Sequence, residues 1–408
     1  MGYSLSKKQI LNGATDCFHW GRQRSWPATL GVTVVEIERV LFLQPQPCIR
    51  ALKYARGLKR ALDGKVSIVF GYLYHTLNTL YGCGDETFDE LKKLRKDNLE
   101  SDIKRLVERH RPQVIHSHNA PDFLTVSAIE AVGKALPIIH DCHEALSLRR
   151  TGYYVKDDDV KILEEYPKQE KMANEGSDGR IYVTEEVKNY IQQRYDVNPE
   201  TDIVFLNYVS ESVMPQHFKE KLSAKDGQTH IVYIGTVTSR IGECHYDLRE
   251  IFKEIASHNV HVHLYVSLFG LEDKAYKELA DGNRFIHHHG HLDHGTLLKE
   301  ITRYDYGWAG FNTNEKNEKH VEATLPNNIF EYVACGLPVL AFHHRTVRNF
   351  IDEHNAGFVF NDLNEMASQL KDREATRRVR ENVLDIRHRF TVERNIGTVV
   401  DFYEKLCT

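Results

Sequence analysis

The stretch LPNNIFEYVACGLPVL, residues 325–340, places one acidic residue, Glu331, among apolar side chains. Asn328 can cap a helix here, Gly336 can end that helix in the left-handed conformation, and Pro338 prevents it from continuing. The pattern predicts a helix of about eight residues followed at once by a buried strand. We therefore expect an α/β unit at this point of the chain.

Short apolar runs and helical segments alternate on both sides of this unit. The runs that indicate strands are 39–44, 65–73, 113–118, 136–141, 179–183, 202–210, 230–237, 260–267, 284–292, 305–311 and 337–342. Helical segments, most of about 10–15 residues, separate them, which is typical of parallel sheets with right-handed crossovers. We predict an α/β fold class: two doubly wound Rossmann-like domains facing an interdomain cleft, where ligands of such sheets bind.

Composition limits the function classes. A net charge of -5 over 408 residues gives no electrostatic reason to expect nucleic acid as a partner. Seven scattered cysteines without a CxxC pair indicate reduced thiols and a cytoplasmic protein. No run of about 18 apolar residues predicts a membrane span, and peripheral membrane contact stays open. No GxGxxG motif follows the first predicted strand, and the sequence contains no GxxxxGK[ST] or GxSxG motif. A dehydrogenase, a P-loop enzyme and a hydrolase therefore lose their main support.

Glu331 allows two interpretations. Asn-x-x-Glu is close to a capping box, in which the glutamate only satisfies its own helix. Alternatively, the start of the helix receives an anion such as a phosphate, with Glu331 binding a neighbouring part of the same ligand.

A histidine-rich segment raises the question of a metal. Its histidines lack the cysteine or carboxylate company and the helical spacing of a zinc site. We expect no metal there; the residues concerned are His287, His288, His289, His291 and His294.

Several separated motifs resemble, in the same order, those of retaining nucleotide-sugar glycosyltransferases of the glycosyltransferase-B fold, family 4 in particular. LPNNIFEYVACGLPVL is similar to their P-x-K-x-x-E-Y-x-A-x-G-x-P-V signature, and IVYIGTV to the glycine turn that begins their donor domain. HHGHLDHGTLLKEITRYDYG resembles the segment that ends in an aspartate, here Asp305. VIHSHNAPDF and IIHDCHE are similar to their acceptor-domain loops, and FTVERNIGTVVDFYEKL to their last helix. The resemblance covers about residues 38–406.

The resemblance implies a domain division. Residues 1–37 form an N-terminal extension, 38–212 an acceptor-side Rossmann-like domain and 213–390 a donor-binding Rossmann-like domain. Residues 391–408 form a C-terminal helix that crosses back to the first domain. The implied reaction moves a sugar, with retention, from a nucleoside diphosphate sugar to a hydroxyl of a glycan or lipid-linked acceptor, without a metal or other cofactor.

The resemblance also implies site residues. Those for the donor are Gly235, Thr236, Arg240, Asn327, Asn328 and Glu331. Those for catalysis are His143, Asp141 and Arg240, and those on the acceptor side are His116, His118 and Glu144. For His116 and His118, positioning of a loop and contact with substrate are both open.

The sequence also departs from the family pattern. The glutamate expected eight residues before Glu331 is Ala323, with Glu322 one place off, while Asn328 replaces a lysine and Thr236 an arginine. These departures leave two alternatives to a transferase. One is a catalytically inactive nucleotide-sugar-binding module that partners an active transferase. The other is an epimerase of the same two-domain fold, for which the sequence supplies no assignable acid and base pair.

Overall fold

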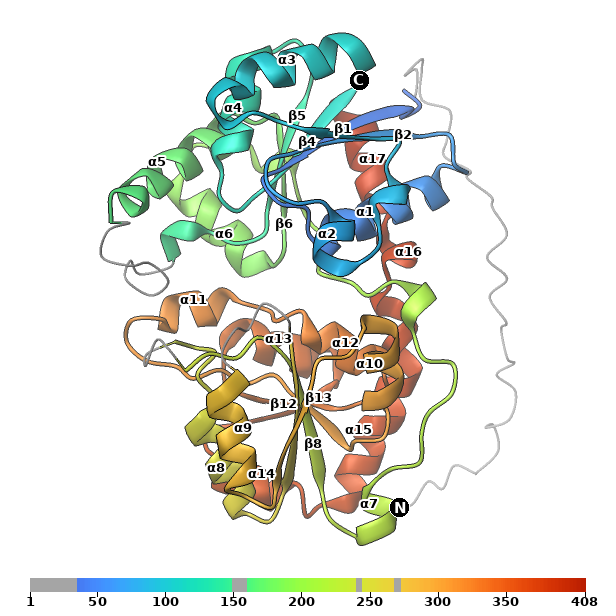
Figure 1. Cartoon of the computed structure of the whole chain (residues 1–408), viewed down its shortest axis with the longest axis vertical. Coiled ribbons are helices and arrows are strands. Elements are labelled where there is room, and N and C mark those ends of the chain that lie inside the picture. The colour runs from blue at the N-terminus through green and yellow to red at the C-terminus, as the bar shows by residue number, and fades with distance from the viewer. Residues whose placement is uncertain (1–34, 149–159, 240–243, 268–272) are drawn as a thin grey trace, which may run out of the picture. The chain divides into compact units, whose positions relative to one another are not determined.

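The computed structural model describes residues 35–148, 160–239, 244–267 and 273–408. These residues form two parallel sheets, each with helices on both faces (Figure 1). The α/β fold class predicted from the sequence is confirmed. In the part of the chain that the structure describes, no helix is long and apolar enough to span a membrane.

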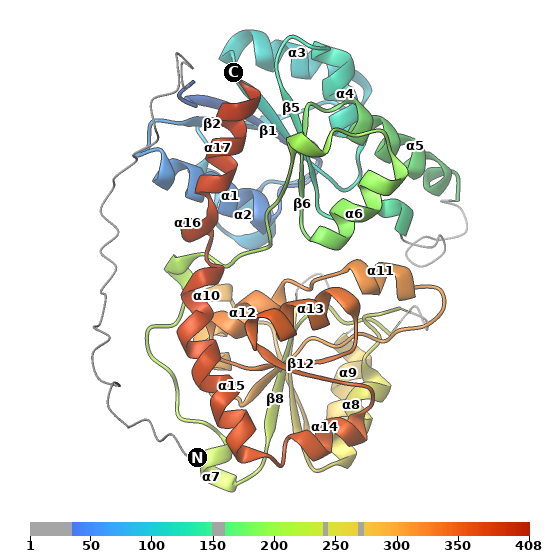
Figure 2. The same cartoon turned by 180° about the vertical axis from the view of Figure 1, so that it is seen from behind.

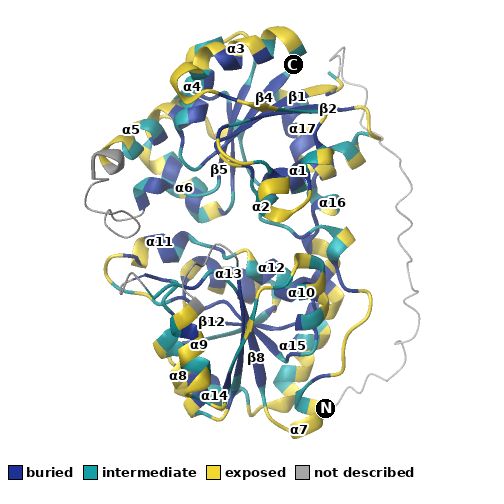
Figure 3. Ribbon diagram, in the orientation of Figure 1, coloured by how far each residue is buried: buried dark blue, intermediate teal, exposed yellow. Residues whose placement is uncertain are grey.

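The first sheet has seven strands in the order β3-β2-β1-β4-β5-β6-β7, all paired in parallel. The strands are β1 (Arg39–Gln44), β2 (Ser67–Tyr72), β3 (Glu90–Lys93), β4 (Val114–His118), β5 (Ile138–Cys142), β6 (Gly179–Tyr182) and β7 (Asp202–Val204). β4 and β5 are buried along their whole length, as expected for central strands covered on both faces (Figure 3).

Helices from both ends of the chain cover this sheet. They are α1 (Ile49–Ala61), α2 (Leu77–Tyr81), α3 (Leu99–His110), α4 (Phe123–Val132), α5 (Val160–Gly176), α6 (Glu185–Arg194), α16 (Val392–Asn395) and α17 (Gly397–Leu406). Apolar residues of α1, α16 and α17 share one core cluster with β1, β2 and β4 (Figure 2). Those of α3 and α4 pack in another cluster with alternate residues of the same strands. The C-terminal helix thus completes the core of the first sheet.

The second sheet has six strands in the order β10-β9-β8-β11-β12-β13. The strands are β8 (His230–Gly235), β9 (His261–Val266), β10 (Ile286–Gly290), β11 (Tyr306–Trp308), β12 (Val339–Phe342) and β13 (Gly357–Phe360). The helices are α7 (Ser223–Asp226), α8 (Arg249–Ser257), α9 (Asp273–Asp281), α10 (His294–Ile301), α11 (Glu318–Ala323), α12 (Asn328–Ala334), α13 (Arg345–His354), α14 (Leu363–Gln369) and α15 (Arg373–Ile386). α8, α9 and α14 pack on one face, and α10, α12, α13 and α15 on the other.

Short 3-10 turns join these elements: η1 (Asp85–Thr87), η2 (Lys96–Asn98), η3 (Leu146–Leu148), η5 (Pro199–Thr201), η6 (Glu211–Val213) and η7 (Arg387–Phe390).

The segment 86–110 reads as one charged helix in the sequence, and that prediction is wrong. Its first part forms strand β3, and α3 begins only at Leu99. β3 is the edge of the sheet, and two of its four side chains are exposed, so its lysines face water and hide the apolar signal of a strand. Residues 363–388 also read as one helix in the sequence, and the structure divides them into α14 and α15, because Asp372 caps the second helix.

Candidate functional site

One group of polar side chains lies at the carboxyl ends of β4 and β5. The register pairs His118 with Asp141, and His116 precedes His118 on the same face of β4. His143 follows β5 directly. Adjacent parallel strands thus bring together four of the residues predicted from the sequence.

A guanidinium from α1 neutralises the central carboxylate of this group. Arg50 Nε donates to Asp141 Oδ2 and Nη2 to Oδ1, both at 3.1 Å, and Nη1 donates to Asn207 Oδ1 at 2.8 Å. Burial alone would raise the pKa of Asp141, but the charge of Arg50 and hydrogen bonds from histidines hold that pKa well below its ordinary value. Asp141 is therefore an anion locked in place by a bidentate pair.

Three imidazoles surround the same carboxylate oxygen. His116 Nε2 and His143 Nε2 lie 3.3 Å from Asp141 Oδ2, and His118 Nδ1 lies 3.1 Å from it. Burial lowers the pKa of His116 and, more strongly, that of His118, where neighbouring His116 adds to the effect. His116 also contacts the hydroxyl of Tyr403 on α17 through Nδ1. The buried rings are therefore neutral near pH 7.

Exposure separates the roles open to these residues. Asp141, His116 and His118 are 0% exposed, whereas the side chain of His143 is 19% exposed. Only His143 of these four can touch a substrate in this conformation. For His116 and His118 burial favours the positioning role over substrate contact. Glu144, next along the chain, is half-buried, and its backbone carbonyl accepts from Asn119 Nδ2 at 3.0 Å.

His116, His118 and Asp141 are also residue types that bind metals, and one donor atom of each lies within 4.8 Å of the others. Both oxygens of Asp141 are already occupied by Arg50, which supplies the positive charge that a cation would bring. The group is fully buried as well. This arrangement suits an ion-pair network better than an open metal site.

A second group lies at the carboxyl end of β8. Gly235 ends the strand with φ of +141°, in the range that favours glycine, and a Cβ there would lie 3.3 Å from the hydroxyl of Tyr233. Thr236 follows; its carbonyl accepts from Tyr233 and its hydroxyl lies 3.1 Å from that of Ser267. Arg240, predicted for donor binding and catalysis, lies outside the described residues.

α12 is fixed against this end of β8. Asn328 Nδ2 donates to the carbonyl of Ile234 at 3.1 Å. Tyr332 Oη accepts from the Ile234 backbone N–H at 3.1 Å and donates to the carbonyl of Trp308 at 3.0 Å. The ring of Tyr332 covers Gly307, where any side chain would collide with it. The tyrosine after Glu331 therefore anchors the helix to two strands.

Glu331 does not form the capping box that its spacing suggests. The N-cap residue is Asn327, not Asn328, and it makes no side-chain capping bond. Glu331 Oε1 instead pairs with His294 Nε2, at the start of α10, at 2.7 Å, and the Glu331 side chain is 20% exposed. Gly336 has φ of +68°, as predicted for the residue that ends this helix. The glutamate thus has an open side from which a ligand can reach it.

Two other carboxylates have structural partners. Glu322, one place from the position of the family's first glutamate, accepts from the backbone N–H of Arg345 at 3.0 Å and so caps α13. Asp305 accepts from the backbone N–H of His230 at 2.9 Å and from Ser223 at 2.6 Å. Both carboxylates therefore fix local structure.

Sequence reasoning missed three residues of these groups: Arg50, Lys53 and His294 as a partner of Glu331. Arg50 stands four residues before Tyr54 and eight before Leu58, all buried on one face of α1. A charge on an otherwise apolar face was the signal that could have found it. Burial lowers the pKa of Lys53, and the negative charge of Glu331 opposes that shift. The charges of Lys53 and Glu331 therefore act on each other.

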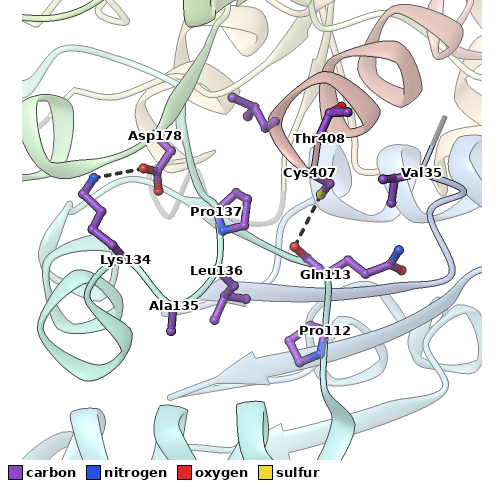
Figure 4. A pocket seen from close by; sticks show the side chains of 11 residues that line it. Val35, Pro112, Gln113, Lys134, Ala135, Leu136, Pro137, Asp178, Cys407 and Thr408 are labelled. Atoms are coloured by element: carbon purple, nitrogen blue, oxygen red, sulfur yellow. Dashed lines mark hydrogen bonds and ion pairs between the residues drawn. The ribbon is translucent and has the colours of Figure 1, made fainter. Parts of the chain in front are cut away.

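A cavity of about 490 Å³ lies at the other end of the first sheet, before the amino ends of β4 and β5 (Figure 4). Lys134 and Asp178 pair at its wall at 2.9 Å, and Gln113 and Cys407 line it as well. None of the predicted site residues lines this cavity. The interdomain cleft expected from the sequence stays a prediction.

Two family models match the chain. Residues 90–209 match the model described as Glycosyltransferase Family 4, and residues 248–401 match the Glucosyltransferase 3-like C-terminal domain. The resemblance noted in the sequence is thereby confirmed. Comparison with curated proteins gives no match.

Solved structures share the fold. WaaG, a glycosyltransferase involved in lipopolysaccharide biosynthesis, matches with a TM-score of 0.63 and 12% identity over 89% of this chain and 99% of its own. Sucrose-phosphate synthase from Thermosynechococcus elongatus matches with a TM-score of 0.62 and 12% identity over 90% of this chain and 99% of its own. UDP-GlcNAc 2-epimerase from Neisseria meningitidis, bound to UDP-GlcNAc, matches with a TM-score of 0.55 and 13% identity over 90% of this chain and 100% of its own. At these identities the matches establish the glycosyltransferase-B fold, but they do not establish which reaction the protein catalyses.

Proposed function

Because the chain carries a family 4 glycosyltransferase domain and a glucosyltransferase 3-like C-terminal domain, we propose that it transfers a hexose from a nucleoside diphosphate sugar to a hydroxyl acceptor. The acceptor is a glycan or a lipid-linked glycan precursor, and the anomeric configuration is retained. No metal ion takes part. Contact with a membrane surface would follow from a lipid-linked acceptor.

Glu331 is the observation that carries the proposal. It is a partly exposed carboxylate on an otherwise buried helix, it is not used for capping, and His294 holds one of its oxygens. It lies three residues after Asn328, whose side chain is hydrogen-bonded to the end of β8. A carboxylate in this place suits two adjacent hydroxyls, such as those of a ribose, with roughly 1.5–3 kcal/mol per charged hydrogen bond.

The diphosphate of the donor would lie at the turn after β8. The glycine at position 235 leaves room for close approach of a phosphate, and the backbone amides of Gly235 and Thr236, with Arg240, would donate to its oxygens. Asn327 and Asn328 supply polar groups beside them. As the bond between the anomeric carbon and the phosphate oxygen breaks, its electron pair stays on the diphosphate, where these donors stabilise the growing charge.

The acceptor hydroxyl would approach the anomeric carbon from the side on which the diphosphate leaves, and its proton passes to the departing phosphate oxygen. His143 would then face the transferred sugar. Asp141 and Arg50 fix the orientation of His143 through the 3.3 Å contact of its Nε2, so the pair acts as a positioning device.

A two-part assay tests the proposal. Thermal stabilisation by a panel of uridine, guanosine and adenosine diphosphate sugars identifies the donor. Release of the nucleoside diphosphate is then measured with glycan and lipid-linked acceptors. Acceptor-dependent release supports the transferase. Stabilisation without release would support the inactive binding module, and conversion of the sugar without an acceptor and without release would support an epimerase.

A further inference from the structure

Five histidines lie side by side on one face of the second sheet, on strands β8, β9 and β10. The rings of His230 and His261 are stacked at 4.6 Å with planes 8° apart, and those of His263 and His289 at 5.2 Å and 9°. His263 and His287 are stacked at 4.4 Å. The family resemblance and the proposed reaction assign these residues no role.

The strand register explains the cluster. His230 pairs with His261 and His287 with His263, and residues two apart on one strand share a face. β10 is an edge strand, so its histidines are partly or fully exposed, whereas His230 and His263 are buried. The cluster therefore runs from the interior of the sheet to solvent at its edge.

Two chains of hydrogen bonds run through the cluster. In the first, Asp226 Oδ2 lies 3.0 Å from His230 Nε2, and His230 Nδ1 lies 2.9 Å from His263 Nε2. His263 Nδ1 in turn lies 2.9 Å from His289 Nε2.

In the second chain Gln228 Oε1 lies 3.0 Å from His261 Nε2, and His261 Nδ1 lies 2.8 Å from His287 Nε2. Both chains begin at the turn between α7 and β8. In each, the inner imidazole presents Nε2 to an oxygen of that turn, and a second imidazole holds its Nδ1.

The inner ends of these chains converge. One donor atom each from Asp226, His230 and His261 lies within 4.8 Å of the others, and the oxygen of Gln228 is beside the last. We propose that these residues bind a divalent transition-metal ion of the zinc class, with Asp226, His230 and His261 as ligands and Gln228 or water in the fourth position. Two imidazoles and a carboxylate are a ligand set suited to such an ion.

The outer histidines support the site in the way that metal sites require. A ligating imidazole usually has its other ring nitrogen held by a fixed partner, which sets its tautomer and orientation. His263 does this for His230, and His287 does it for His261. On binding, His230 Nε2 and Asp226 would turn to the ion in place of the 3.0 Å contact that they make with each other.

The site is separate from the proposed reaction centre. His230 begins β8 and Gly235 ends it, so at about 3.3 Å per residue the two lie roughly 16 Å apart. The ion would join the end of α7 to β8 and β9 and so stabilise the domain. The histidine-rich segment in the sequence is 287–294, but the ligands come from α7, β8 and β9, and the pairing of β8 with β9 brings His261 to the other two.

The test uses the full chain, without a histidine tag and stripped with a chelator. Co²⁺ is titrated while its visible absorption is followed, Zn²⁺ is titrated by calorimetry, and the melting temperature is recorded with each ion. We expect one tightly bound ion per chain and a rise in melting temperature. Asp226→Asn and His261→Gln, at positions that are not fully buried, should each weaken binding about 100-fold, and His287→Gln about 10-fold or more.

His217→Ala is the matched control, because His217 is an exposed histidine of the same domain outside the cluster, and it should bind like wild type. No binding to wild type, or equal binding by Asp226→Asn, His261→Gln and wild type, would overturn the proposal. Stabilisation by the nucleotide sugar should be the same in these variants as in wild type, so the failure of this proposal and that of the proposed function can be told apart.

Discussion

Asp141 is the residue on which most contacts of the first sheet's polar group converge. It has no exposed surface, carries a negative charge and is contacted by Arg50 and three imidazoles. Such a carboxylate stays in a protein interior only because its partners compensate the loss of water. Its removal therefore affects stability and the orientation of His143 together, whereas a change at His143 affects function alone.

Asp141→Asn should leave the buried Arg50 guanidinium without its anion and lower the free energy of unfolding by about 3–5 kcal/mol. Urea unfolding measures this. His143→Gln, at the partly exposed member of the same group, should unfold within about 1 kcal/mol of wild type while losing transferase activity. Equal stability of Asp141→Asn and wild type would contradict the assigned ion pair.

Glu331 and His294 form a pair whose two members have different tasks. His294→Gln keeps Glu331 in place but removes the ring that orients it, so we expect the KM for the donor to rise about tenfold with kcat little changed. Steady-state kinetics at saturating acceptor would show this. A fall in kcat with an unchanged KM would mean that the pair acts in the chemical step and not in donor binding.

At the scale of the element, α12 depends on close contact between Tyr332 and the strand beneath it. Gly307→Ala would push a methyl group into the Tyr332 ring and, by overpacking, should cost about 1–3 kcal/mol of stability and weaken donor binding. Gly295→Ala in α10 is the control, since the nearest atom to its new Cβ is 3.7 Å away. Thermal unfolding with and without donor compares them. Donor binding as in wild type would show that the position of α12 does not matter.

The elements also show what a sequence can and cannot predict. Central strands such as β1 and β12 are nearly continuous apolar runs because helices bury both faces, and they were predicted. β3 was missed because its edge position leaves lysines exposed, and Arg50 because its partner Asp141 lies 91 residues away. The pairing of Glu331 with His294 likewise depends on how α10 and α12 pack, which no local pattern reports.

The whole molecule should lose stability in mild acid. His116 and His118 have folded-state pKa values below the ordinary 6.5, so the unfolded chain takes up protons that the folded chain does not as pH falls below about 6.5. Each of these histidines lowers the free energy of unfolding by up to about 1.4 kcal/mol for each pH unit. Asp141, whose pKa is also lowered, adds a further loss below about pH 4.

Urea unfolding between pH 7.5 and 5 measures this slope. His118→Asn should flatten it relative to wild type, because one of the depressed histidines is gone. An unchanged slope would mean that His118 does not stay neutral in the folded protein.

The proposal to be tested at this scale is that the chain binds a donor nucleotide sugar through Glu331 and transfers its sugar. The most direct measurement is acceptor-dependent release of nucleoside diphosphate by wild type, Glu331→Ala and the exposed control Glu353→Ala, with folding checked by thermal unfolding. The account predicts that Glu331→Ala, still folded, loses about 10- to 100-fold in kcat/KM for the donor, while Glu353→Ala matches wild type. Donor kinetics unchanged in folded Glu331→Ala would contradict it.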